Sequence, residues 1–141
     1  MQYIEAPENW DENTNSLFMA GGITGCPDWQ KELVAFLDDV EITLLNPRRK
    51  SFDTKKLSET KEQIEWEHKH LKKASAISFW FPKETLCPIT LYELGTWSAK
   101  GKKLFIGVHP EYKRKKDVGV QCLRWCYMQR RLSLQGLMPR P

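Results

Sequence analysis

The sequence predicts a parallel α/β fold, because short apolar runs alternate along the chain with longer amphipathic segments. Glycine or proline closely follows each of the first three runs, as expected where a strand ends. Four runs have the length and composition of strands: Ser16–Ala20, Ile42–Leu45, Ala76–Phe81 and Leu104–Val108. In such a fold the carboxyl ends of the strands face one crevice, which is where open α/β sheets bind ligands.

Segments with helical spacing of apolar residues follow the predicted strands. Pro27 precedes the first segment, as is common at a helix start, and Gly101 ends the third. A polar loop from Arg48 to about Ser58 separates the second strand from the second helix. The predicted helices are Asp28–Leu37, about Glu59–Lys73, about Pro88–Ala99 and Val118–Leu132.

The 141 residues are enough for one hydrophobic core, and no internal repeat or shift in composition marks a second domain. We expect residues 16–135 to form the domain. Residues 1–15 read as an N-terminal extension outside the core, and residues 136–141 as a tail that is loosely ordered or docked on a partner.

The composition excludes several classes of protein. Hydrophobic content of 40% and charged content of 28% are ordinary for a globular protein. No apolar run approaches the roughly 20 residues that span a bilayer, and the polar, acidic N-terminus does not resemble a secretory signal. We therefore expect a cytoplasmic protein with no membrane partner. The net charge of +4 lies in short, dispersed clusters, which favour a solvated surface over phosphate contact and make nucleic acid an unlikely partner.

The cysteines and histidines give no clear metal site. The four cysteines form no CxxC pair, and a disulfide framework is not expected in this compartment. Cys122 and Cys126 are four residues apart and could share a helix face, but no histidine lies near them, so structural thiols are the favoured reading. His68 and His70 diverge on a helix and are expected at the surface. The sequence therefore predicts no metal.

Candidate binding residues follow the ends of the first three strands. The turn Gly21–Gly25 permits close approach of a ligand to backbone amides, although a plain tight turn explains it equally well. Arg48 and Arg49 suit a phosphate or a carboxylate, or are simply solvated. The run Trp80–Pro82 suits the stacking of a nucleobase, or core packing. The candidate substrate-binding residues are Gly21, Gly22, Ile23, Thr24, Asp28, Trp29, Asn46, Arg48, Arg49, Trp80, Pro82 and Thr85.

Two glutamates stand out as candidate catalytic acids. Glu93 lies in apolar company on the predicted helix that follows the third strand, next to Leu94. Glu67 lies three residues after Ile64 and four before Leu71, which places it on the inward stripe of its helix. A carboxylate on a buried face needs a partner or a raised pKa; such groups cluster at functional sites, although structural ion pairs also hold inward acids.

Two carboxylates on neighbouring helices, a stacking surface and an anion-tolerant loop suggest chemistry at a glycosidic carbon. One carboxylate can attack the anomeric centre or stabilise an oxocarbenium ion, while another group assists the leaving base.

The chain resembles the nucleoside 2-deoxyribosyltransferase-like family over most of residues 16–118. Each matching segment is modestly specific, and five in the right order are strongly so. The segments are FMAGGITGCPDWQ (Phe18–Gln30), LLNPRR (Leu44–Arg49), QIEWEHKHLKKASAISFWFP (Gln63–Pro82), ETLCPITLYELG (Glu84–Gly95) and GKKLFIGVHPEY (Gly101–Tyr112).

This resemblance implies a flavodoxin-like or Rossmann-like three-layer sandwich with a mostly parallel five-stranded sheet. It implies cleavage of the N-glycosidic bond of a small-molecule nucleoside or nucleotide, with Glu93 of the ELG motif as nucleophile and Glu67 assisting. The turn Gly21–Ile23 would line the sugar and base pocket. The resemblance also implies no metal or organic cofactor, and a homodimer or higher homo-oligomer.

Three residues depart from the family pattern. Cys87 stands six residues before Glu93, where well-studied transferases carry a base-contacting aspartate. Phe18 replaces a tyrosine found in some members, and Ser75 replaces an acid common in relatives. Three functions remain open: transfer of the sugar to a second base, hydrolysis of a nucleoside 5′-monophosphate or related N-glycoside, and nucleotide binding without turnover.

Overall fold

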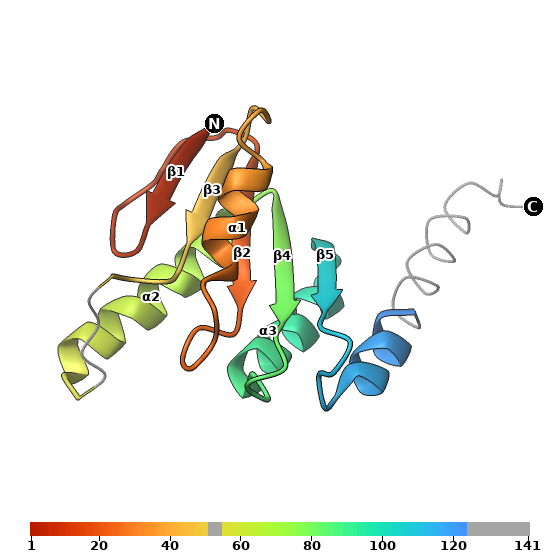
Figure 1. The fold of residues 1–141 in the computed structure, drawn as a ribbon. Helices are drawn as coiled ribbons and strands as arrows, with labels where there is room; N and C mark the ends of the chain where they lie inside the picture. The colour runs from red at the N-terminus through yellow and green to blue at the C-terminus, as the bar shows by residue number, and fades with distance from the viewer. Residues whose placement is uncertain (51–54, 124–141) are drawn as a thin grey trace, which may run out of the picture.

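In residues 1–50 and 55–123, which a computed structural model describes, five parallel strands form one sheet in the order β1-β3-β2-β4-β5 (Figure 1). The strands are β1 (Gln2–Glu5), β2 (Ser16–Gly21), β3 (Thr43–Asn46), β4 (Ala76–Phe81) and β5 (Lys103–Val108). The predicted parallel α/β fold of the flavodoxin-like or Rossmann-like kind is confirmed.

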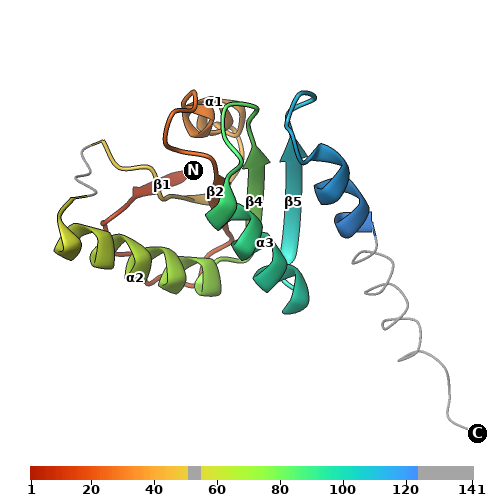
Figure 2. The same cartoon turned by 90° about the horizontal axis from the view of Figure 1, so that it is seen from below.

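Helices cover both faces of this sheet. Helix α1 (Trp29–Phe36) lies on one face, and α2 (Leu57–Lys73) and α3 (Pro88–Ala99) lie on the other (Figure 2). From β2 the chain passes through α1 to β3 on one side of β2, and then through α2 to β4 on the other side. The strand order therefore reverses at β2, and the crevice at this switch point is where such sheets bind ligands.

The position of residues 1–15 differs from the prediction. Residues 1–15 were expected to lie outside the core, but β1 pairs with β3 from Gln2↔Thr43 to Glu5↔Asn46. Ile4 and Trp10 are buried in the core. An edge strand of four residues turns only two side chains to each face, so its alternation is too short to see in the sequence.

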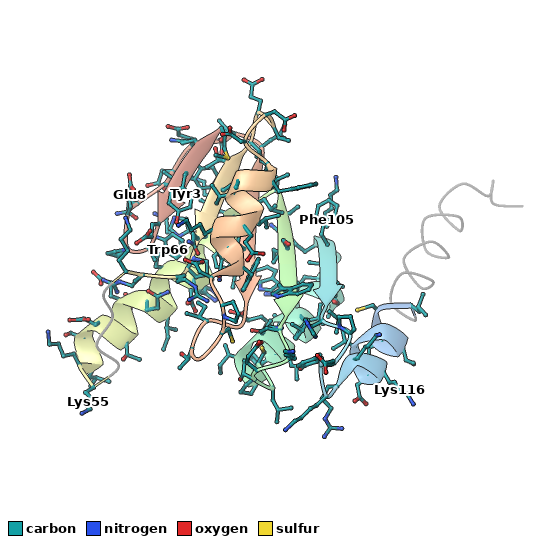
Figure 3. The ribbon with its side chains drawn as sticks, viewed as in Figure 1. Tyr3, Glu8, Lys55, Trp66, Phe105 and Lys116 are labelled. Atoms are coloured by element: carbon teal, nitrogen blue, oxygen red, sulfur yellow. The ribbon has the colours of Figure 1, made fainter. Side chains whose placement is uncertain are left out.

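The segment that follows β1 is fastened to helix α2. The Trp66 indole donates a hydrogen bond of 2.7 Å to the carbonyl of Glu8; Figure 3 labels both side chains, with Tyr3 near them. Lys69 and Lys73 form ion pairs with Asp11 at 3.1 and 3.3 Å. The N-terminal residues thus belong to the same packed unit as the rest of the sheet.

The other elements lie close to their predicted positions. Strand β4 and helix α3 have the predicted bounds, and the other predicted elements up to β5 differ from the observed ones by at most two residues at either end. Asp28 is the N-cap of α1 and accepts a hydrogen bond from the amide of Lys31. Residues 115–123 are helical, so this helix begins three residues before the predicted start at Val118. The remainder of that helix, Cys126 and the predicted tail lie outside the described residues.

Helix α2 has a different inward face from the one predicted. Ile64 is 60% exposed, whereas Trp66, His70 and Leu71 are buried. The prediction that His70 lies at the surface is wrong: its ring stacks on Trp66 at 4.1 Å between centroids, and its Nδ1 lies 2.7 Å from the Trp66 carbonyl. His68 is exposed, as predicted.

Successive side chains of the strands pack into two separate hydrophobic cores, one on each face of the sheet. Leu17 and Met19 of β2 pack with Trp29 on the α1 face. Phe18 and Ala20, one step along the strand, pack on the α2 and α3 face. The cavity described below lies on this second face.

Candidate active site

A cavity of about 340 Å³ opens at the carboxyl end of the sheet, next to the switch point. Its walls are the end of β2 with the turn that follows, Pro47 after β3, Glu67 on α2, and the turn that leads into α3 with the first two turns of that helix. Segments far apart in the sequence therefore contribute to one site, as the topology predicts.

Both candidate catalytic acids line this cavity. Glu67 comes from α2 and Glu93 from α3, and each side chain is partly buried. Burial raises the pKa of Glu93 to about 8, and the nearby charge of Glu67 adds to that increase. Burial also raises the pKa of Glu67. Such shifts in a cleft are typical of catalytic acids and bases.

Gln63 determines which of the two acids ionises first. Its side-chain amide donates hydrogen bonds of 2.8 Å to the Pro47 carbonyl and 2.7 Å to Glu67 Oε1. The hydrogen bond to Glu67 opposes the effect of burial on its pKa, whereas Glu93 has no such contribution. We therefore assign the first negative charge to Glu67, with Glu93 protonated beside it.

The turn after β2 needs its glycines because other groups come close. A Cβ at Gly21 would lie 2.5 Å from the Trp80 carbonyl oxygen, and one at Gly22 would lie 2.6 Å from Pro82 Cγ. The Trp29 indole packs beside Gly21 and donates a 3.0 Å hydrogen bond to the Gly22 carbonyl. Gly21, Gly22, Ile23 and Thr24 all line the cavity, whereas Trp29 supports the turn from behind.

Arg48 holds this turn and does not line the cavity. Its Nη2 donates hydrogen bonds to three carbonyls of the turn, those of Ile23 (3.3 Å), Cys26 (3.5 Å) and Pro27 (3.0 Å). Its Nε contacts Gln30 at 3.0 Å and Asp28 at 3.5 Å. Arg48 and Asp28, both predicted to bind substrate, are thus engaged in fixing the turn and are not among the described residues that line the cavity.

The neighbours of Arg48 are also engaged within the protein. Arg49 forms an ion pair of 2.9 Å with Glu62. The buried Asn46 accepts a hydrogen bond from the Arg48 amide and donates one of 2.7 Å to the Tyr3 hydroxyl. Asn46, Arg48 and Arg49 were all predicted to bind substrate, and none of them is among the described residues that line the cavity.

Trp80 lies on the wrong face of the sheet to stack a base beside Glu93. It packs with the core under α1 and, with Pro82, lines a separate hollow of about 530 Å³ beside Trp29 and Phe36. Phe79 and Phe81 point to the α2 and α3 face instead. Because neighbouring strand residues face opposite sides, Trp80 cannot share a face with them.

The turn before α3 supplies a strained residue, Cys87, which the resemblance places where a base-contacting acid is expected. Cys87 has left-handed backbone angles, φ 47° and ψ 56°, which are uncommon outside glycine. Strain of this kind is often concentrated at functional sites. Its thiol lines the cavity, and burial raises its pKa to about 11, so the group is neutral at pH 7.

The remaining candidate residues differ in whether they line the cavity, and some cavity residues were not predicted from the sequence. Thr85, a predicted binding residue, lines the cavity, and its hydroxyl accepts a hydrogen bond from the Cys87 amide at 3.4 Å. Ser75 lies at the opposite end of the sheet, where it and Ser16 exchange hydrogen bonds. Helical spacing from Glu93 could have identified Thr90 and Ile89. Phe18 and Cys87, two of the departures from the family pattern, also line the cavity, and the residues missed by the sequence are Ala20, Pro47, Pro88, Ile89 and Thr90.

Residues 1–50 and 55–123 contain no group of three or more His, Cys, Asp or Glu side chains arranged to hold a metal ion. Among the same residues, no helix has the length and apolar character needed to cross a membrane.

The sequence model of a family described as nucleoside 2-deoxyribosyltransferase like matches residues 14–112, which include Glu67, Glu93 and every other residue that lines the cavity. A search among curated proteins found no match.

Proposed function

Because the chain belongs to the nucleoside 2-deoxyribosyltransferase-like family, we propose that it cleaves the N-glycosidic bond of a nucleoside and transfers the sugar to a second nucleobase. The observation that carries this proposal is the pair of shielded carboxyl groups, Glu67 and Glu93, on the wall of one cavity. Two carboxyl groups beside a reacting sugar are a recurrent arrangement for chemistry at an anomeric carbon.

In the first step the ionised carboxylate of Glu93 attacks C1′ of the sugar. The bond between C1′ and the base nitrogen breaks, its electron pair stays on the base, and the base takes up a proton from solvent. In the second step a nitrogen of the incoming base attacks C1′, the ester bond to Glu93 breaks, and the carboxylate is regenerated as the new base loses its proton. Glu67, ionised first, stabilises the positive charge that develops on the sugar.

Hydrolysis is the main alternative, and it differs only in the second step. Water attacks C1′ of the glycosyl ester instead of a base, and free sugar is released. The same two carboxyl groups would serve, so the nature of the acceptor decides between the two reactions.

A 5′-monophosphate substrate receives less support than a nucleoside. Arg48, the cation expected to meet the phosphate, donates to the carbonyls of the turn. Among the described residues that line the cavity, two are carboxylic acids and none is basic. Neighbouring carboxylates repel a phosphate. The neutral nucleoside is therefore the favoured substrate class.

Binding without turnover is the third reading, and Cys87 supports it. A neutral thiol stands where a base-contacting acid is expected from the resemblance. The replacement of an acid by the Cys87 thiol would alter recognition of the base. Both carboxyl groups needed for cleavage nevertheless remain in the cavity.

The test uses purified protein, each 2′-deoxynucleoside, and a free acceptor base. Base exchange that outruns release of free sugar supports transfer, whereas release that is independent of the acceptor supports hydrolysis. We expect Glu93→Ala to lower kcat by at least ~10³-fold, since loss of a nucleophile removes the covalent route. The matched control is Glu65→Gln, an exposed acid on α2. Residual activity of Glu93→Ala within about tenfold of the wild type would exclude Glu93 as nucleophile.

A further inference from the structure

Thr90 has a hydroxyl that is open to the cavity. The residue is only 5% exposed, it lines the cavity that contains Glu67 and Glu93, and no hydrogen bond to its hydroxyl is found among the described residues. The oxygen is not one of the fully shielded polar atoms without a partner, so it can be reached from the cavity. A polar group that is accessible only from a cavity is available to a ligand bound there.

The ordinary partner of a threonine hydroxyl in a helix is the carbonyl four residues earlier. Thr96, on the same helix, follows this rule and donates to the Tyr92 carbonyl at 3.0 Å. For Thr90 the corresponding carbonyl is that of Leu86, which accepts a 2.8 Å hydrogen bond from the Tyr112 hydroxyl. Leu86 also lies outside α3, before the left-handed Cys87, so its carbonyl is not part of the helix, and no hydrogen bond from Thr90 to it is found.

Thr90 and Glu93 lie on the same side of α3, because residues three apart on a helix are neighbours at about 5–6 Å between their Cβ atoms. The nucleophile must approach C1′ from the ring face opposite to the departing base. In a β-nucleoside this face also carries any 2′- and 3′-hydroxyls. A side chain next to Glu93 on the same helix therefore faces sugar hydroxyls, while the base points away from α3.

We propose that the Thr90 hydroxyl binds a sugar hydroxyl of the substrate, either 2′ or 3′, and thereby determines which sugar the site accepts. This inference rests on the proposed function and extends it to sugar specificity. A site built to hydrogen-bond a substrate hydroxyl rejects the analogue that lacks it, since the protein group is then left unpaired. The predicted ligand class is a nucleoside that carries the matching hydroxyl.

The test compares Thr90→Val, which removes the hydroxyl, with Thr90→Ser, which keeps it. The control is Thr96→Val, which removes an exposed hydroxyl elsewhere on α3. Each variant is assayed with ribo-, 2′-deoxy-, 3′-deoxy- and 2′,3′-dideoxynucleosides of the base that the wild type cleaves fastest. Comparison of the single-deoxy substrates identifies which hydroxyl Thr90 contacts.

We expect Thr90→Val to lower kcat/KM about 10–100-fold on substrates with the contacted hydroxyl and less than about threefold on those without it. Thr90→Ser should stay within about threefold of the wild type, and Thr96→Val should have no effect. Equal losses of Thr90→Val on all four sugars would indicate a structural role and overturn the inference, as would no loss at all.

Measurements of nucleoside binding distinguish failure of the proposed function from failure of this inference. Dissociation constants of the same four nucleosides are measured with catalytically impaired Glu93→Gln, with and without Thr90→Val. If the wild type binds a nucleoside but turns none over, the proposed transfer fails. The inference then stands only if Thr90→Val weakens binding of the hydroxyl-bearing sugar about tenfold or more. If no nucleoside binds, both are overturned.

Discussion

Glu93→Gln is expected to stabilise the protein at neutral and alkaline pH. Burial and the charge of Glu67 raise the pKa of Glu93 from 4.5 to about 8 in the folded protein. The unfolded chain loses this proton near pH 4.5, whereas the folded protein keeps it until about pH 8. The folded state therefore binds more protons in this interval, and the wild type loses stability as the pH rises from about 4.5 to about 8.

The size of the loss follows from the pKa difference. One pKa unit corresponds to about 1.4 kcal/mol, so the shift from 4.5 to about 8 sets an upper limit of about 5 kcal/mol above pH 8 and about 3 kcal/mol at pH 7. Glutamine has nearly the same shape and no charge to desolvate. We expect Glu93→Gln to match the wild type at pH 5 and to exceed its unfolding free energy by ~1–5 kcal/mol at pH 8.5.

Urea unfolding at pH 5, 7 and 8.5 measures this difference directly, because the titration of other groups largely cancels between variant and wild type. Glu65→Gln is the matched control: Glu65 is an exposed acid of α2 in an ion pair of 3.7 Å with Lys61. It should change stability by less than ~0.5 kcal/mol at every pH. A difference for Glu93→Gln that does not grow between pH 5 and 8.5 would refute the assignment of Glu93 as a desolvated acid.

Three further predictions follow from the same structure. If Glu93 must be ionised to attack, kcat/KM should rise with pH up to about 8; a flat profile from pH 6 to 9 would contradict its role. Arg48→Met should lower the unfolding free energy by ~2–4 kcal/mol in urea, since three carbonyls lose a charged donor, whereas the exposed Arg114→Met should change little. Burial lowers the pKa of His70, so the unfolded chain binds its proton first on acidification. The wild type should therefore lose stability below about pH 6.5, and the loss should be smaller in His70→Gln by thermal unfolding; equal losses would show that His70 is not responsible.

Local signals in the sequence were sufficient for the centre of the fold. The aromatic run of β4 and the proline that opens α3 gave both elements their observed bounds. Glu67 was placed correctly on the inward face of α2 although Ile64, used as its marker, is exposed. The true marker is Trp66 with the polar residues Gln63 and His70. Trp66 and His70 contact the segment that follows β1, and Gln63 donates to the Pro47 carbonyl after β3. Hydropathy does not predict this polar inward stripe.

The errors at the site concern which way a side chain faces. Trp80 is one residue from Phe79 and Phe81, and the sequence alone does not say which of the two faces lies under α3. The sequence predicts that Arg48 meets an anion, whereas its partners in the structure are backbone carbonyls. These partners could not be predicted, because every residue has a carbonyl and none is marked in the sequence. Such roles depend on tertiary approach of segments about 20 residues apart.

The distribution of charge links the stability of the site to its chemistry. The chain carries a net charge of +4, yet the described lining of the cavity holds two carboxyl groups and no basic residue. A nearby cation would lower the pKa of Glu93 and stabilise the fold, but it would also disfavour the positive charge that develops on a sugar as its base leaves. Without that cation, the negative charge of the two carboxylates is unfavourable in the empty site. It becomes favourable in the transition state, where it faces the positive charge on the sugar. Glu93→Gln should therefore become more stable and lose turnover together, which is the trade-off expected when a functional group is held in an unfavourable environment.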